Sequence, residues 1–207
     1  MQLCIIKVLF YLTLRSHGFL KSQDMPGLVK FPFAKRKNLL VMTFCIGFEP
    51  IIPSSPKILI LGTMPSVASI DEAFYYAHPR NAFWPIIASL VSRSLVSIDD
   101  KQQACNEKGI LLWDVLQSCQ RPGSLDSAIK QPLANDFESL FQTYPQLKTI
   151  AFNGQAAEKL FKKEVLKKQI LPKELGFITL PSTSPAYAAI TFEDKRLLWQ
   201  EKLSKLL

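Results

Sequence analysis

The sequence is poor in the side chains that hold metals. Its 207 residues include only two histidines, and its four cysteines (Cys4, Cys45, Cys105, Cys119) form no C-x-x-C pair. Zinc sites and iron–sulfur clusters use close sets of such ligands, so neither is expected here. We expect no metal and no organic cofactor, and cysteines that remain thiols in a reducing cytoplasm.

Long apolar runs are also missing. The run from Cys4 to Leu14 is interrupted by Lys7 and is too short to span a bilayer. No small-residue cleavage site follows it, which argues against a secretory signal. The sequence therefore predicts a cytoplasmic protein without a membrane partner, and the alternative is that this run anchors the chain at a membrane surface.

The main part of the chain has almost no excess charge. The net charge of +8 comes largely from residues 1–41, which carry seven Lys and Arg and one Asp. Residues 42–207 carry 18 basic and 16 acidic side chains, so overall charge does not by itself indicate nucleic-acid binding. We expect residues 1–41 to be an extension, either disordered or the result of a start placed too far upstream, and residues 42–207 to form a single domain.

Along residues 42–207, continuous apolar runs alternate with segments whose apolar residues recur at helical spacing. Buried strands are expected at 57–61, 109–113, 147–152 and 176–180, and helices at 82–93, 136–143, 155–168 and 193–206. In the last helix, Leu197, Leu198, Leu203 and Leu206 are expected to form the apolar face. Residues 94–108 are polar and receive no element. The alternation predicts an α/β fold of three layers, α/β/α, around a mostly parallel central sheet of about four strands.

Polar clusters follow each expected strand. They are residues 62–66 with 74–84, Asp114, Asn153, and residues 181–187. Parallel α/β sheets bind ligands beyond the carboxyl ends of their strands, so these clusters are expected to meet in one crevice. Residues 74–84 hold five aromatic rings with His78, Arg80 and Asn81, a composition that suits a planar, hydrogen-bonding ligand such as a nucleobase. The alternative is that the rings are core and Asn81 only caps the next helix.

Two segments carry a family resemblance. Tyr76-Ala-His-Pro-Arg-Asn-Ala-Phe-Trp84 resembles the Phe-Ala-His-Pro-x-Asn-x-Phe-Trp element of mismatch-specific uracil-DNA glycosylases. With Leu61-Gly-Thr-Met-Pro-Ser66 included, the pattern is still more similar to the hypoxanthine-DNA (deoxyinosine) glycosylase branch of that superfamily. The resemblance implies an enzyme that flips a base out of DNA and hydrolyses its N-glycosidic bond.

The resemblance assigns the catalytic role to Asn81. The superfamily usually has Asp or Asn in the first turn, where this chain has Met64, and a thioether cannot polarise water. In the hypoxanthine branch the Asn of the Pro-x-Asn element positions the water instead, and Asn81 occupies that place. Tyr76 aligns with the aromatic ring that stacks on the flipped base, and Thr63 and Met64 are also expected to bind the base. Phe83 and Trp84 are expected in the core.

Recognition of the base edge and contact with the DNA backbone are expected from segments later in the chain. Asp114 stands where uracil-specific relatives have a base-reading Asn, and an ionised carboxylate there only accepts hydrogen bonds; the alternative is a cap or ion-pair partner. The turn at 181–187 resembles the loop that enters the minor groove. Its expected DNA contacts, with Ser66, are Pro181, Ser182, Thr183, Ser184 and Tyr187, the last as a wedge. Supporting roles are expected for His78, Arg80 and Asn153.

Taken together, these features predict a monomeric, monofunctional DNA glycosylase of base excision repair. Its first-choice substrate is hypoxanthine in DNA, and uracil or thymine opposite guanine is the first alternative. The vacancy at Met64 favours a different class, a non-catalytic DNA- or nucleotide-binding module on the same fold.

Overall fold

The computed structural model describes residues 44–207, and the extension expected at residues 1–41 lies outside them. Four parallel strands form the central sheet in the order β3-β2-β6-β7. They are β2 (Ile58–Gly62), β3 (Ile110–Asp114), β6 (Thr149–Asn153) and β7 (Gly176–Leu180). These are the four strands that the apolar runs predict, so the expected mostly parallel sheet is confirmed.

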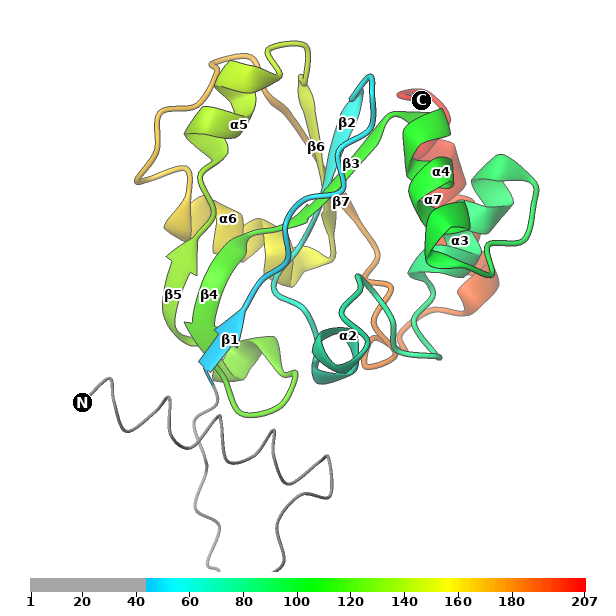
Figure 1. Cartoon of the computed structure of the whole chain (residues 1–207), viewed down its shortest axis with the longest axis horizontal. Helices are drawn as coiled ribbons and strands as arrows, with labels where there is room; N and C mark the ends of the chain where they lie inside the picture. The colour runs from blue at the N-terminus through cyan, green and yellow to red at the C-terminus, as the bar shows by residue number, and fades with distance from the viewer. Residues whose placement is uncertain (1–43) are drawn as a thin grey trace, which may run out of the picture. The chain divides into compact units, whose positions relative to one another are not determined.

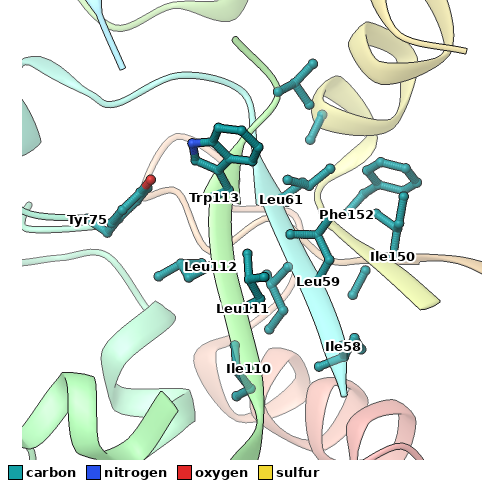
Figure 2. Close-up of a cluster of buried hydrophobic side chains, with 14 of the residues drawn as sticks. Ile58, Leu59, Leu61, Tyr75, Ile110, Leu111, Leu112, Trp113, Ile150 and Phe152 are labelled. Atoms are coloured by element: carbon teal, nitrogen blue, oxygen red, sulfur yellow. The ribbon is translucent and has the colours of Figure 1, made fainter. Parts of the chain in front are cut away.

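Helices cover both faces of this sheet (Figure 1). One face carries α3 (Phe83–Val91), α4 (Ile98–Lys108) and α7 (Phe192–Leu203), and the other carries α5 (Phe137–Thr143) and α6 (Gln155–Glu164). Because β2 and β3 are buried on both faces, their residues are apolar without alternation, and their side chains project to either side in Figure 2. The three-layer α/β/α prediction is confirmed.

The structure contains elements that the sequence reading lacks. The polar stretch at 94–108 holds α4, which starts in a capping box between Ser97 and Asp100 and buries only Ala104 and Cys105. With only two buried positions, α4 has no helical repeat of apolar residues by which the sequence could reveal it. A second, antiparallel sheet is formed by β1 (Phe44–Ile46), β4 (Leu116–Gln120) and β5 (Lys130–Ala134). Short connecting elements are α2 (Val67–Asp71) and the 3₁₀ turn η1 (Asp126–Ala128).

The expected apolar face of α7 is partly wrong. Leu197 and Leu198 are exposed, whereas Trp199 and Leu203 are fully buried. Trp199 packs edge-on against Phe83 of α3. This contact orients α7, and the prediction missed it because it considered only the leucines. Phe83 and Trp84 are buried in the core, as expected.

The cysteines, the metal-binding side chains and the membrane-spanning helices can be assessed only within residues 44–207. Cys105 and Cys119 are buried thiols, and the Cys45 thiol donates to the carbonyl oxygen of Arg121 at 3.9 Å. Residues 44–207 bring together no group of three or more His, Cys, Asp or Glu side chains able to hold a metal ion. In the same range, none of the helices has the length and apolar content needed to cross a membrane.

Candidate active site

A cavity of about 120 Å³ lies where the four parallel strands end. Gly62 ends β2, Asp114 ends β3 and Asn153 ends β6, and all three residues line the cavity together with the segment that follows β7. Ten of the residues expected at the site contribute to its wall: Thr63, Met64, Ser66, Tyr76, Asn81, Asp114, Asn153, Ser182, Thr183 and Ser184. The topology therefore brings distant segments of the sequence to one crevice, as parallel α/β sheets do.

Asp114 and Tyr76 meet at one side of this cavity. A Cβ atom built on Gly62 would lie 2.3 Å from Asp114 Oδ1 and 2.9 Å from Tyr76 Oη, so both oxygens crowd the same glycine. Within residues 44–207, Asp114 Oδ2 has no hydrogen-bond partner, although the atom is buried. Buried polar atoms without partners are uncommon in folded proteins and are a feature of binding sites.

The protonation of Asp114 differs from the sequence-based expectation. Its side chain is 3% exposed. Burial, followed by the negative charge of Asp126, raises the pKa of the Asp114 carboxyl to about 7, and the Arg121 guanidinium lowers it in part. Near neutral pH the group therefore exists both as an acid, which can donate a hydrogen bond, and as a carboxylate, which can only accept.

Tyr76 is held with one ring face covered. Its ring stacks on Phe83 with centroids 4.1 Å apart and planes 24° apart, and its backbone has a left-handed φ of 52°. Burial and the nearby Asp114 raise the pKa of the Tyr76 phenol far above its usual value, so the hydroxyl stays protonated. A base could stack only on the ring face that Phe83 leaves uncovered.

Asn81 both contacts the start of α3 and lines the cavity. Its Oδ1 accepts a hydrogen bond from the backbone N–H of Phe83 at 2.9 Å, which satisfies a free donor at the start of α3. The same side chain lines the cavity. Its backbone N–H donates to the carbonyl of His78, and His78 Nδ1 accepts from the backbone N–H of Arg80 at 3.1 Å. His78 thus stabilises the turn that precedes Asn81.

The 181–187 loop is fixed from three directions. Asn153 makes two hydrogen bonds to Thr183, and the Ala82 N–H donates to the Thr183 carbonyl at 3.0 Å. Trp199 Nε1 donates to the carbonyl of Pro181 at 2.9 Å. The loop is therefore attached to β6, to the start of α3 and to α7. Asn153, the last residue of β6, thus holds this loop through its side chain.

Four expected residues do not line the 120 Å³ cavity: His78, Arg80, Pro181 and Tyr187. Arg80 and Tyr187 instead border a neighbouring hollow of about 370 Å³, whose wall also includes Asn81, Thr183 and Ser184. Tyr187 is 40% exposed, and Lys195 Nζ donates to its carbonyl at 2.7 Å and lies 5.1 Å from its ring centroid.

Two charged residues at the site were missed. Asp126 lines the cavity, and its Oδ1 accepts from Thr63 Oγ1 at 2.7 Å. Arg121 is 1% exposed, donates to the Pro65 carbonyl and has its Nη1 3.7 Å from the same Asp126 oxygen. Neither residue is assigned a role from the sequence. An arginine and an aspartate five residues apart in a loop, beside a Gly-Ser pair, were the one available signal.

Comparisons with known proteins agree with this geometry. The family described as the uracil DNA glycosylase superfamily matches residues 49–205. A protein from Methanosarcina barkeri named "Hypoxanthine DNA glycosylase" is 39% identical over 111 residues, which cover 53% of this chain and 70% of that protein. A protein of the same name from Methanosarcina acetivorans is 34% identical over 135 residues, covering 63% of this chain and 85% of that protein.

A solved structure is also similar. The solution NMR structure of a Methanosarcina acetivorans protein, described as a candidate uracil DNA glycosylase, aligns with a TM-score of 0.65 and 30% identity. The alignment covers 79% of this chain and 99% of that one. The family match spans most of the chain and includes every strand-end segment that lines the cavity, and the chain therefore belongs to the uracil DNA glycosylase superfamily.

Proposed function

We propose that this protein is a monofunctional DNA glycosylase of base excision repair that flips a deaminated base out of DNA and hydrolyses its N-glycosidic bond. Hypoxanthine is the first-choice base, supported by the two relatives named for it. The observation that carries the proposal is the cavity itself, where Asn81 shares one small space with the unpartnered Asp114 carboxyl at the ends of the parallel strands. Its products are a free base and an abasic site.

Each side chain has a role in this proposal. The uncovered face of Tyr76 stacks on the flipped base, a contact of about 1–3 kcal/mol in proteins that bind single strands. Asp114 reads the base edge, accepting from a ring N–H as a carboxylate or donating to a carbonyl as an acid. Asn81 positions the attacking water.

DNA is gripped outside the cavity in this proposal. Ser66 and the hydroxyls and backbone N–H groups of residues 181–184 approach the phosphates, and Tyr187 fills the space that the flipped base leaves. Arg80 borders the same hollow as Tyr187 and supplies positive charge toward the backbone.

The test uses duplexes that contain deoxyinosine, deoxyuridine or thymidine opposite defined bases, followed by alkaline cleavage of abasic sites. Excision is expected first from deoxyinosine. Preferential excision of uracil or thymine opposite guanine would change the substrate while keeping the enzyme class.

Asn81→Ala tests the catalytic assignment. Its rate under single-turnover conditions is expected to fall by about 10²–10³-fold, the usual loss when one positioned polar group is removed. Asn106→Ala is a matched control because Asn106 Oδ1 also accepts one backbone N–H, from Ser54 at 2.8 Å, and does not line the cavity. Full activity of Asn81→Ala would reject the assignment.

A non-catalytic binding module is the second candidate. Met64 favours it, because this buried thioether lines the cavity where the superfamily usually has Asp or Asn. Tight binding to a deoxyinosine duplex, with no product from any substrate, would support this candidate over the enzyme.

A further inference from the structure

None of the roles assigned in the proposed glycosylase reaction includes a group that takes the proton of the attacking water. Attack on the sugar requires that water lose a proton, and an amide such as that of Asn81 orients water but does not act as a base. Met64 offers only a thioether. Asp114 is 3% exposed and is assigned to the base edge, so it is not the group that meets the attacking water. The remaining carboxylate in the cavity wall, among the described residues, is Asp126.

We propose that Asp126 is a catalytic residue, the general base that deprotonates the water positioned by Asn81. The inference depends on the glycosylase function proposed above. It adds Asp126, which is not among the site residues expected from the sequence. Asp126 comes from η1, in the connection between β4 and β5 of the antiparallel sheet, so a different part of the chain supplies the carboxylate that position 64 lacks.

The carboxylate of Asp126 is held by one oxygen only. Oδ1 accepts from Thr63 Oγ1 at 2.7 Å and lies 3.7 Å from Arg121 Nη1, and no hydrogen bond occupies Oδ2 among the described residues. The Asp126 side chain is 40% exposed, so water can reach the carboxylate. This is the arrangement that a base requires, with a fixed orientation and an accessible oxygen.

The surroundings also favour a useful basicity. Partial burial raises the pKa of the Asp126 carboxyl, while the Thr63 hydrogen bond and the Arg121 charge lower it in part. A carboxylate with a raised pKa accepts a proton more readily than an ordinary surface aspartate.

The simpler explanation is that Asp126 only neutralises the buried Arg121. The geometry is poor for that role alone. The 3.7 Å separation is longer than a hydrogen bond, and Arg121 Nε has no partner within residues 44–207 although it is buried. Arg121 is instead anchored through Nη2 to the Pro65 carbonyl. The pair is therefore not arranged as a two-pronged ion pair, and one carboxylate oxygen is left for another task.

The chemical step is balanced with water as the only co-substrate. A proton moves from the water to Asp126 Oδ2 as the water oxygen bonds to sugar C1′. The bond between C1′ and the base nitrogen breaks, and its electron pair leaves with the base as an anion. The protonated Asp126 then releases its proton to the departing base or to solvent, which regenerates the carboxylate.

The test compares wild type with Asp126→Asn and with Asp71→Asn, a control at an exposed aspartate that does not line the cavity. Three quantities are measured: the single-turnover excision rate, the dissociation constant for a duplex with an uncleavable tetrahydrofuran abasic analogue, and the thermal unfolding midpoint. Asp126→Asn is expected to lose about 10²–10⁴-fold in rate, the usual contribution of a general base, which is more than its change in binding or in unfolding midpoint accounts for. Asp71→Asn is expected to behave as wild type.

Asp126→Glu adds a second readout. It keeps the negative charge beside Arg121 but moves the carboxylate by one methylene, so it is expected to stay folded and to be slow. A wild-type rate in Asp126→Asn would overturn the inference, as would a rate loss in that variant matched by weaker binding and a lower unfolding midpoint. Inactivity of the wild type on every duplex would instead reject the glycosylase function.

Discussion

Asn153 holds Thr183 through two hydrogen bonds: its Nδ2 donates to Thr183 Oγ1 at 2.8 Å, and its Oδ1 accepts from the Thr183 N–H at 2.9 Å. Both groups of the amide are used, so Asn153 fixes the position and the orientation of this residue. Thr183 is 1% exposed, and its carbonyl accepts from the Ala82 N–H beside Asn81. The end of β6 therefore aligns the proposed DNA-contacting loop with the proposed catalytic turn.

Asn153→Ala should uncouple these segments. Loss of two hydrogen bonds, with the buried Thr183 groups left unpaired, is expected to reduce the free energy of unfolding by about 1–3 kcal/mol. Excision should slow as well, because the 181–187 loop loses its register. Urea unfolding and single-turnover assays would measure both effects, with Asn106→Ala as the control amide deletion. Wild-type stability and activity of Asn153→Ala would show that the loop holds its place without the clamp.

Gly62 is expected to be essential for the geometry of the cavity. An alanine Cβ there would lie 2.3 Å from Asp114 Oδ1, so the carboxyl and Tyr76 would both have to shift. We expect Gly62→Ala to cost about 1–3 kcal/mol of stability, as overpacking usually does, and to impair excision. Gly176→Ala is the matched control, because the nearest atom to its added Cβ is the Lys148 carbonyl oxygen at 3.5 Å. Equal behaviour of the two variants would contradict the proposed crowding.

The central sheet could be predicted from sequence because the signal for each strand lies within that strand's own residues. Strands buried on both faces are continuous apolar runs, and β2 and β3 are such runs. The antiparallel sheet was missed because β5 is largely exposed and contains Pro132, and α4 was missed because its surface is polar. These elements depend on pairing partners and caps rather than on their own apolar pattern.

The site was predictable where polar residues directly follow a strand. Asp114 and Asn153 are the last residues of β3 and β6, so the parallel topology alone brings them together. Asp126 and Arg121 follow no strand of that sheet, and their position depends on how the chain returns through β4 and β5. The unpartnered state of Asp114 is likewise a property of packing, which the sequence does not contain.

Asp114 should make stability depend on pH. Burial favours its protonated form, and the difference between its ordinary pKa of 3.8 and about 7 in the fold corresponds to about 4 kcal/mol. This stabilisation is complete below about pH 4 and is lost as the pH rises through about 7. Asp114→Asn has no such proton to lose, so it should match wild type at pH 4 and be more stable at pH 8. Denaturant unfolding at several pH values would check this, and a constant difference between the two proteins would refute it.

Lys195 should control how firmly Tyr187 is held. Lys195 is 6% exposed, and burial lowers the pKa of its ammonium group. Its hydrogen bond to the Tyr187 carbonyl and its position over the Tyr187 ring fix the residue proposed to enter the DNA stack.

Lys195→Met keeps the apolar stem of the side chain and removes the charge, so it should weaken binding to a deoxyinosine duplex by about 1–3 kcal/mol, the usual value of a hydrogen bond to a charged group. Lys202→Met, at an exposed lysine of the same helix, is the control. If Lys195 acts through Tyr187, the double variant with Tyr187→Ala should bind no more weakly than Tyr187→Ala alone. Additive losses would mean that Lys195 affects DNA directly, through its own charge, and that the contact with Tyr187 is incidental to binding.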